Sequence, residues 1–548
     1  MPLSLSPPRL LLLLLVLSVV WFGNLEHRKL ALTDEGRYAE IPREMVASGD
    51  WTTPRLNGLK YFEKPALQYW ATATAYSLFG QHHWTARLWT ALTGFLGILA
   101  TYFAGRRLFG AQAGLYGALV LASSLLYVGM GQMNTLDMGV AFFMGLGLNA
   151  FLLAQHAGAS RRENNIWMHV VWASLALSVL SKGLIGLVLP GAVLVIYTLI
   201  QRDWGLWRRL HLLSGLALFL VISAPWFVAV SLANPEFFHF FFIHEHFERF
   251  LTKIHRRYEP WWYFIPILMA GILPWLVPTF DALLRAWKID GERKAFQAGR
   301  FLLIWAAFIF FFFSISSSKL PSYILPIFPA LALLTGQHLA RMQGRTLFWQ
   351  ILPMAILAIA GLWLSSRAVN LAGDESSRQA YAQYGLWAAV TAACWLAGIG
   401  AGLYLAYRQR VQVAILIIAL ASLLAEQSLL RGHDLLARTT STYYLAQDIK
   451  PYLKPGATFY SIGMYEQTLP FYLDRTVTLV AYQDEMAFGI QQEPGKWIAD
   501  IPSFEQKWRT EAYALAIMLP DTYQQLKSHG LPMKEIARDT RRVVVSTP

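Results

Sequence analysis

The chain has 548 residues, of which 55% are hydrophobic and only 14% are charged, and its formal net charge is +13. A soluble protein of this length needs a larger charged fraction to cover its surface, so the composition excludes an ordinary soluble enzyme and a disordered chain. The single cysteine, Cys394, excludes disulfide scaffolds, cysteine-based zinc sites and iron–sulfur clusters. In a membrane protein a positive surplus is more often topological than directed at nucleic acid, so no nucleic-acid partner is expected.

The first apolar run extends from Leu10 to Gly23 and follows Arg9. No small-x-small cleavage site follows this run, so we interpret it as a retained first span rather than a cleaved signal. Further apolar stretches of spanning length lie near 87–108, 113–131, 138–156, 168–181, 184–201, 210–231, 261–280, 300–316, 321–340, 348–366, 385–406 and 411–429. The sequence therefore predicts an all-α polytopic membrane domain over 1–430 with about 13 transmembrane helices.

Two connections on the predicted outer side of the membrane are long, 24–86 and 232–260. Within the first, segment 66–80 is apolar but has threonines spaced along it, so we expect a helix that lies in the membrane interface rather than a span. We expect the catalytic residues in these two outer loops.

The distribution of basic residues predicts how the chain is oriented in the membrane. With the N-terminus on the cytoplasmic side, the basic residues of the predicted inner connections follow the positive-inside rule. They are Arg106, Arg107, Arg161, Arg162, Arg202, Arg208, Arg209, Arg285, Lys288, Arg293, Lys294, Arg300, Arg341, Arg345, Arg408 and Arg410. An odd number of spans then puts the tail, 431–548, on the outer side.

The tail differs from the rest of the chain because polar stretches alternate with short β-like runs. These runs are 457–463, 476–482, 513–518 and 542–546. We therefore predict a small C-terminal α/β domain outside the membrane.

Several cations on the outer side break the positive-inside bias, among them Lys64, Lys182, Arg249 and Lys319. Two interpretations stay open. These side chains either reach lipid headgroups and nearby carboxylates, or they bind an anionic ligand such as a lipid phosphate.

Carboxylates accompany these cations at the predicted membrane surface. Asp34 and Glu35 follow Thr33 and suit a helix N-terminus, but a carboxylate there could equally serve catalysis. Asp137 begins a span, where it is either a cap or a site residue that pairs with Lys182 or with a cationic amine of the donor, because an ionisable group at this depth is costly without a partner.

A metal site and a sugar site are further hypotheses for this outer face. Glu63 and His244 have the ligand chemistry for one divalent ion, zinc or magnesium, with a solvated surface histidine as the alternative. Tyr38 and Tyr61 are candidates for stacking on a sugar or lining a lipid groove, although interfacial aromatic residues often only mark the membrane boundary.

Three motifs carry a resemblance to a known family: Thr33–Ala39 (TDEGRYA), Tyr61–Pro65 (YFEKP) and Lys319–Pro326 (KLPSYILP). They resemble the polytopic glycosyltransferases of GT-C type that use polyprenyl-phosphate sugars. Within these, the chain is similar to the bacterial 4-amino-4-deoxy-L-arabinose transferases that modify lipid A. The resemblance covers roughly 1–430 and the layout of many spans followed by a periplasmic tail.

The resemblance implies a donor, an acceptor and a location. The donor is undecaprenyl-phosphate aminoarabinose, the acceptor is a lipid A phosphate, and inverting transfer takes place at the periplasmic face of the bacterial inner membrane. The modification would lower the negative charge of lipid A and give resistance to polymyxin and other cationic peptides. The expected partners are these two lipids and the surrounding membrane lipids, and we expect a monomer.

The resemblance also assigns roles to residues. Asp34 resembles the catalytic acid of the first outer loop, and Lys64, Arg249 and Tyr323 resemble contacts to the donor phosphate. The full set of candidates comprises Asp34, Asp137 and Glu35 for catalysis, Lys64, Arg249, Tyr323 and Lys182 for the donor phosphate, and Arg37, Tyr38 and Tyr61 for the sugar and lipid cavity.

Two other functions remain as alternatives. The same donor chemistry could serve a protein or another glycan as acceptor, and the sequence separates these acceptors poorly. A transporter or flippase tends to place ionisable groups at mid-membrane and often has internal repeats, whereas here the polar residues cluster on one side and no repeat is visible. The sequence therefore favours a transferase.

Overall fold

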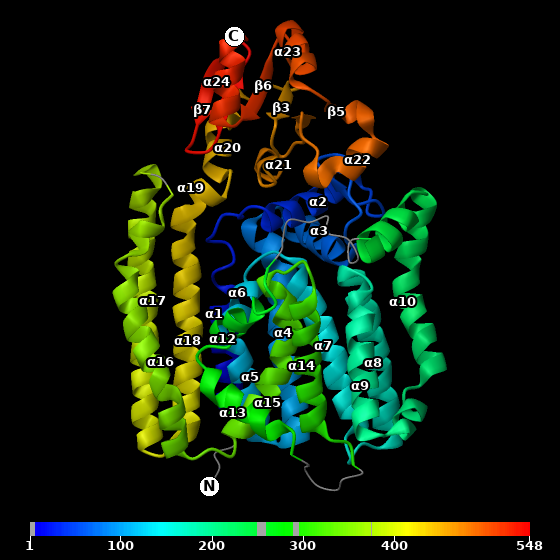
Figure 1. Ribbon diagram of the computed structural model, residues 1–548, viewed down its shortest axis with the longest axis vertical. Helices are drawn as coiled ribbons and strands as arrows, with labels where there is room; N and C mark the ends of the chain where they lie inside the picture. The colour runs from blue at the N-terminus through cyan, green and yellow to red at the C-terminus, as the bar shows by residue number, and fades with distance from the viewer. Residues whose placement is uncertain (1–5, 249–258, 289–294, 374) are drawn as a thin grey trace.

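The computed structural model describes residues 6–248, 259–288, 295–373 and 375–548. Long helices run side by side to form a tall bundle, and a small mixed α/β unit sits on one end of it (Figure 1). The first helix, α1 (Pro7–Phe22), lies within the bundle, whereas the C-terminus lies in the α/β unit. The expected class, a polytopic helical protein with a small C-terminal α/β domain, is confirmed.

The bundle helices follow the predicted apolar stretches closely. After α1 they are α4 (His83–Phe109), α7 (Leu136–Gln155), α8 (Arg161–Lys182), α9 (Ile185–Gln201), α10 (Leu212–Ala233), α14 (Ala298–Ile315), α15 (Phe328–Leu339), α16 (Gly344–Ser365), α17 (Arg378–Tyr407) and α18 (Val411–Gly432). Shorter helical turns join them: η1 (Trp204–Arg209), η2 (His239–Glu248), η3 (Pro321–Ile327), η4 (Ala368–Leu371), η5 (Glu375–Ser377) and η6 (His433–Leu436).

Two predicted spans are bent rather than straight. Helices α5 (Ala111–Ala122) and α6 (Leu125–Gly131) meet at 65°, and α12 (Phe264–Gly271) and α13 (Leu276–Ala286) meet at 111°. At the first bend the hydroxyls of Ser123 and Ser124 donate to the carbonyls of Leu119 and Val120, which competes with helix continuation. At the second, Pro274 has no N–H to donate.

Not every helix of the bundle is long and apolar enough to cross a membrane by itself. Within the described residues, 7 helices are long and apolar enough to cross a membrane, or up to 9 if each bent pair is one span. Helices α1 and α9 are apolar but shorter. The count of about 13 therefore stays a prediction.

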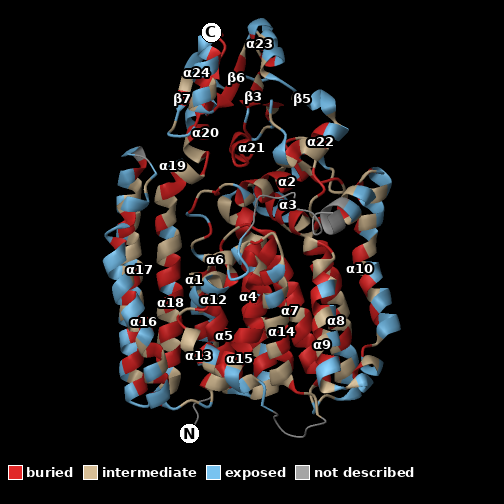
Figure 2. Cartoon of the chain, in the orientation of Figure 1, coloured by how far each residue is buried: buried red, intermediate tan, exposed pale blue. Residues whose placement is uncertain are grey.

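The share of each helix that is buried shows which helices lie at the centre of the bundle and which lie at its edge. In α7, 94% of the most apolar window is buried inside the protein, whereas in α10 and α16 the shares are 17% and 22% (Figure 2). An apolar helix with so little protein around it requires another apolar environment, which lipid provides. Helix α7 is thus the centre of the bundle, and α10 and α16 form its outer surface.

Two helices of the first outer loop lie between the bundle and the α/β unit. They are α2 (Asp34–Ser48) and α3 (Leu67–Phe79), linked through the antiparallel strands β1 (Arg55–Leu56) and β2 (Leu59–Lys60) (Figure 1). Helix α3 corresponds to the expected interfacial helix at 66–80. Both helices therefore form a layer at the end of the bundle on which the α/β unit rests.

The C-terminal unit is built on a six-stranded sheet with strand order β5-β4-β3-β6-β8-β7. The strands are β3 (Thr458–Ile462), β4 (Thr478–Val480), β5 (Trp497–Ile498), β6 (Ala514–Met518), β7 (Lys534–Arg538) and β8 (Val543–Ser546). The helices of this unit are α19 (Ala437–Thr440), α20 (Tyr443–Ile449), α21 (Leu469–Leu473), α22 (Ala487–Gln492), α23 (Ile501–Thr510) and α24 (Pro520–Ser528), with short turns η7 (Lys450–Tyr452), η8 (Asp484–Met486) and η9 (Pro494–Lys496).

Four of these strands were expected from the sequence, and two were not. Strand β6, at the middle of the sheet, is buried along its whole length, and β3 nearly so, which explains their apolar runs. Strand β5 has only two residues, and β7 is a mostly exposed edge strand with charged residues. Strand β5 is too short to show an alternating pattern, and the charged residues of β7 interrupt any apolar one.

Candidate functional site

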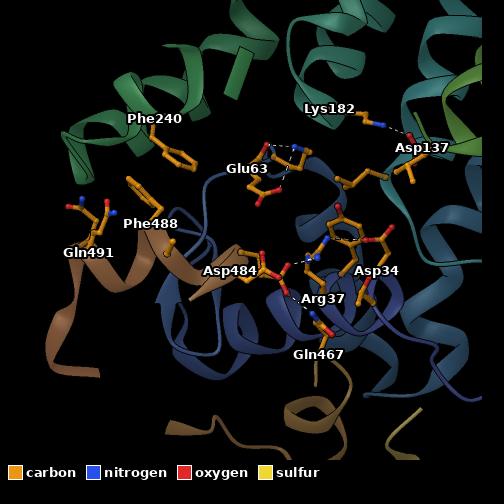
Figure 3. Close-up of a pocket in the computed structure, with 18 of the residues that line it drawn as sticks. Asp34, Arg37, Glu63, Asp137, Lys182, Phe240, Gln467, Asp484, Phe488 and Gln491 are labelled. Carbon is orange, nitrogen blue, oxygen red and sulfur yellow. Dashed lines mark hydrogen bonds and ion pairs between the residues drawn. The ribbon is translucent and has the colours of Figure 1, made fainter. Parts of the chain in front are cut away.

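A cavity of about 900 Å³ lies where the bundle, the α2–α3 layer and the α/β unit meet (Figure 3). Residues from all three parts form its wall. They are Thr33, Asp34, Arg37, Tyr38, Glu63, Lys64, Leu136, Asp137, Lys182, Glu236, His239, Phe240, Leu320, Tyr323, Gln467, Asp484, Glu485, Ala487, Phe488, Gln491 and Gln492. Segments that are far apart in the chain therefore converge on one polar chamber at one end of the bundle.

Asp34 is the first residue of α2 and faces the cavity. Its Oδ1 accepts a hydrogen bond from Arg37 Nη1 at 2.9 Å, and 38% of its side chain remains exposed. Arg37 also forms an ion pair with Glu485 of the α/β unit, and Gln467 Nε2 donates to Glu485 Oε1 at 2.6 Å (Figure 3). Arg37 thus bridges the first outer loop and the C-terminal unit beside a carboxylate that solvent or a ligand can reach.

Glu35 does not line this cavity, although it was expected beside Asp34 in catalysis. It is 2% exposed and points into the protein, where both its oxygens accept from Arg87 of α4 at 2.7 and 2.9 Å. The backbone N–H groups of Ala31 and Asn134 donate to the same carboxylate. Burial favours the neutral acid, but Arg87 outweighs it and lowers the pKa of Glu35 to about 2. Glu35 is therefore a positioning residue, and its assignment to catalysis is corrected.

Gly36 sets how closely α2 approaches the C-terminal unit. A Cβ atom at Gly36 would lie 2.6 Å from the carbonyl carbon of Gln467 and 2.7 Å from the nitrogen of Thr468. Only glycine allows the two backbones to meet this closely. The DEGR motif thus combines a cavity-facing acid, a buried anchor, a close contact and a bridging arginine.

Asp137 and Lys182 form an ion pair at the opposite wall of the cavity. Asp137 lies in the first turn of α7, and Lys182 ends α8. The ammonium group of Lys182 also lies over the ring of Tyr323, 4.7 Å from its centroid. These three expected site residues come from three different helical segments, and the pairing proposed for Asp137 is present.

Lys64 and Glu63 lie on the loop that connects β2 to α3. Lys64 Nζ donates to the carbonyl of Glu63 at 2.7 Å and lies 3.9 Å from its carboxylate. Each cation of the cavity wall thus has an acidic neighbour. An anionic ligand would have to compete with these carboxylates for the cations, either by sharing a cation with a carboxylate or by displacing the carboxylate from it.

Burial changes the ionisation of several groups around Arg37. It raises the pKa of the Glu485 carboxyl, although the Arg37 guanidinium opposes this effect. Burial also raises the pKa of the Tyr38 and Tyr61 hydroxyls. These tyrosines are therefore neutral hydrogen-bonding groups at ordinary pH.

Other expected residues lie elsewhere. Tyr61 is buried behind the cavity wall rather than on it, and Lys319 is buried with its ammonium donating to the carbonyls of Glu259 and Ser316. Arg249 and the side chain of His244 lie outside the described residues. Within the described part of the chain, no group of three His, Cys, Asp or Glu side chains gathers as a metal site. The metal therefore stays a prediction that rests on Glu63 and His244.

The cavity wall that the C-terminal unit contributes was not predicted from the sequence. Gln467 and Glu485 lie in turns without a recognisable motif, and Phe488 belongs to the short helix α22. The ring of Phe488 lies against that of Phe240 of the second outer loop, with centroids 3.9 Å apart and a tilt of 31° between the ring planes. Figure 3 shows the two side chains facing each other. This contact closes one side of the cavity between segments that the sequence assigns to separate domains.

Comparison with known proteins gives matches over nearly the whole chain. A family model described as "Aminoarabinose transferase C-terminal domain" matches residues 445–547, and one described as "Dolichyl-phosphate-mannose-protein mannosyltransferase" matches residues 9–241. The undecaprenyl phosphate-alpha-4-amino-4-deoxy-L-arabinose arabinosyl transferase of Erwinia tasmaniensis is 31% identical over 405 residues, which cover 71% of this chain and 72% of that protein. Its namesake from Pseudomonas aeruginosa is 34% identical over 363 residues, 64% of each chain.

A solved structure is similar over the entire length. The crystal structure of ArnT from Cupriavidus metallidurans bound to undecaprenyl phosphate has a TM-score of 0.94 and 42% sequence identity, and it covers 99% of this chain and 98% of its own. The apo structure of the same protein gives a TM-score of 0.92.

Proposed function

The chain belongs to the family of undecaprenyl phosphate–aminoarabinose arabinosyl transferases, and from this premise we propose how its cavity works. It is a glycosyltransferase that uses a polyprenyl-phosphate-linked sugar, and it transfers 4-amino-4-deoxy-L-arabinose from undecaprenyl phosphate in the modification of lipid A. The observation that carries the proposal is the convergence of Asp34 with Lys64, Lys182 and Tyr323 in one chamber at the end of the bundle.

Transfer needs three contributions from this chamber: neutralisation of the leaving phosphate, stabilisation of positive charge at the anomeric carbon, and orientation of the nucleophile. The acceptor oxygen attacks the anomeric carbon while the bond between that carbon and the donor phosphate oxygen breaks, so charge builds up on the leaving phosphate. Lys64 and Lys182 line the chamber, and in this proposal they neutralise that charge. A phosphate acceptor has lost most of its protons near neutral pH, because its second pKa is about 6. Asp34 therefore acts chiefly on the sugar, by stabilising positive charge that develops at the anomeric carbon or by orienting the nucleophile.

The acidic lining also suits the sugar. Carboxylates outnumber cations along the described wall. Such a wall would repel a ligand that carries only negative charge. A donor with a protonated amine on its sugar and a phosphate beside it can interact with both the carboxylates and the cations. We take a monomer as the working unit.

The acceptor, the metal and the cellular setting are further parts of the proposal. We take a lipid A phosphate as the acceptor, which reduces the negative charge of lipid A and gives resistance to polymyxin and cationic peptides. A divalent ion at Glu63 and His244 would help to hold the donor phosphate. Mass spectrometry of lipid A from cells with and without the gene tests the acceptor. A mass increase of aminoarabinose on lipid A is expected, and an unchanged lipid A with a newly modified protein or glycan would favour the alternative acceptor.

For the topology we propose a bacterial inner membrane protein with a cytoplasmic N-terminus and a periplasmic α/β domain. Reporter fusions after Tyr407 and after Arg431 should report opposite sides of the membrane, because α18 separates them. The fusion after Tyr407 is expected to be cytoplasmic. Identical signals from both fusions would contradict this topology.

For donor binding we predict that Lys64→Ala weakens the affinity for undecaprenyl phosphate by about tenfold to a hundredfold, since a hydrogen bond to a charged group contributes about 1.5–3 kcal/mol. Arg249→Ala should behave similarly, and Arg249→Lys should not restore full affinity because the bidentate fork is lost. Binding to purified variants in nanodiscs measures this effect.

The matched control is Lys29→Ala. Lys29 is also a lysine of the first outer loop, but its ammonium lies over the ring of Tyr443, away from the cavity wall. The Lys29→Ala variant should bind undecaprenyl phosphate with the same affinity as the unaltered protein. Unaltered affinity in both Lys64→Ala and Arg249→Ala would mean that the donor phosphate binds elsewhere.

A further inference from the structure

The C-terminal unit turns one edge of its sheet toward the catalytic chamber. Strands β3 and β4 pair in parallel, so their carboxyl ends lie at the same edge. The segment after β3 contributes Gln467 to the cavity wall, and the segment after β4 contributes Asp484 and Glu485. Ligands of α/β sheets commonly bind beyond the carboxyl ends of parallel strands. This edge is therefore suited to hold a part of the substrate.

One carboxylate of the cavity wall differs from the others because it has no cationic partner. Five wall carboxylates have a cation beside them within the described residues: Asp34 and Glu485 beside Arg37, Glu63 beside Lys64, Asp137 beside Lys182, and Glu236 beside Lys60. Asp484 forms no ion pair in the described part of the chain, and its carboxylate accepts only a long hydrogen bond, 3.5 Å, from the hydroxyl of Tyr482. A cationic group of a ligand can therefore bind Asp484 without displacing a cation of the protein.

The backbone holds Asp484 at a defined position on the wall. Its φ angle is +32°, in the left-handed region that residues other than glycine rarely adopt, although aspartate and asparagine enter it most readily. The next residue, Glu485, is fixed by its ion pair with Arg37 and by the hydrogen bond from Gln467. Backbone conformations of this kind persist where the surrounding structure enforces them, and they cluster at ligand sites.

The position of Asp484 also fits the shape of the donor. Figure 3 shows Asp484 at the end of the cavity where Arg37 lies, well apart from Lys182 and Asp137. In 4-amino-4-deoxy-L-arabinose the amine and the bond to phosphate are at ring positions 4 and 1, which lie on opposite sides of the ring. A donor whose phosphate lies at Lys182 therefore directs its amine away from that lysine, toward the wall formed by the C-terminal unit.

We propose that Asp484 binds the protonated amine of the donor sugar and makes the enzyme select an amino sugar over a neutral one. The ammonium group donates charge-assisted hydrogen bonds to the Asp484 carboxylate, and no bond to Asp484 forms or breaks during transfer. Asp484 is thus a specificity-determining residue rather than a catalytic one. This inference rests on the proposed function, because it assumes that the chamber holds the aminoarabinose donor.

The experiment measures kcat/KM for two donors with the full-length protein in nanodiscs and lipid A as acceptor. One donor is undecaprenyl phosphate–aminoarabinose, and the other carries a hydroxyl in place of the amine. In Asp484→Asn, kcat/KM for the amino donor should fall by about tenfold to a hundredfold, the usual contribution of a hydrogen bond to a charged group. For the hydroxyl donor it should stay unchanged. Asparagine tolerates the left-handed backbone as well as aspartate does, so the substitution removes only the charge.

The matched control is Asp474→Asn. Asp474 is another exposed aspartate of the C-terminal unit with a positive φ, +53°, but it does not line the cavity. This variant should keep the donor preference of the unaltered protein. Asp484→Asn should also bind undecaprenyl phosphate, which has no sugar, with unchanged affinity.

Three results would overturn the proposal. They are an unchanged donor preference in Asp484→Asn, an equal loss for both donors, and a weakened affinity of that variant for undecaprenyl phosphate. The last two would mean that Asp484 supports the fold or the phosphate site instead. If the unaltered protein transfers neither sugar to lipid A, the proposed function itself fails, and this inference fails with it.

Discussion

Asp34→Asn is expected to lower the rate of sugar transfer by about 10²–10⁴-fold while donor binding stays close to that of the unaltered protein. Asparagine has the same shape, and its carbonyl oxygen can still accept the hydrogen bond that Arg37 donates to Asp34. The variant therefore keeps the local structure and loses only the negative charge. Single-turnover transfer in nanodiscs measures the rate, and undecaprenyl phosphate binding measures the donor site separately.

Glu485→Gln is the matched control for this variant. Both carboxylates pair with Arg37, so both variants leave that arginine with one carboxylate fewer. If Asp34 acts only by neutralising Arg37, the two variants should lose the same activity. If Asp34 acts on the sugar, Glu485→Gln should lose much less. Turnover close to normal in Asp34→Asn would instead mean that Asp34 only stabilises the start of α2, an effect of about 0.3–1 kcal/mol.

The helices were largely predictable because lipid imposes a simple rule on the chain. Every span must be a long apolar helix, so hydropathy alone locates α4, α7 and α18 within a few residues. The bends were not predictable in this way, because they depend on local hydrogen bonding at Ser123 and Ser124 and on Pro274. The sequence thus predicts where each span begins and ends, but not where a span bends.

The site was predictable only in part, and the pair Asp34–Glu35 shows why. Adjacent residues on a helix point about 100° apart, so the two carboxylates face different surroundings, and the sequence motif alone does not tell which of them faces the cavity. The sequence did contain a signal that separates them. Arg87 lies near the start of an apolar span, and a buried cation there requires a carboxylate partner. The wall from the C-terminal unit had no such signal, because the contact of Arg37 with Glu485 depends on how two parts of the chain pack.

Glu35→Gln is expected to destabilise the protein by about 3–5 kcal/mol, because it leaves Arg87 buried without its counter-charge. Arg87 is fully buried, and its remaining hydrogen bonds go to the backbone carbonyls of Leu25, Arg28 and Lys29. The same carboxylate holds the backbone of Asn134, which precedes Asp137. The substitution should therefore displace both Asp34 and Asp137, and the variant should transfer sugar more slowly as a result.

Glu163→Gln is the control for Glu35→Gln, and pH gives an independent check. Glu163 pairs with Arg107 at 2.9 Å, but both side chains are exposed, so solvent screens the pair and the same change there should destabilise the protein far less. The pKa of Glu35 lies at about 2, below the ordinary value of 4.5, so its ionised form stabilises the fold above pH 4.5 and this contribution is lost as the pH falls toward 2. Apparent melting temperatures from pH 7 to pH 3 should therefore converge for the unaltered protein and Glu35→Gln. A constant difference across this range would mean that the charge of Glu35 does not hold α2 to α4.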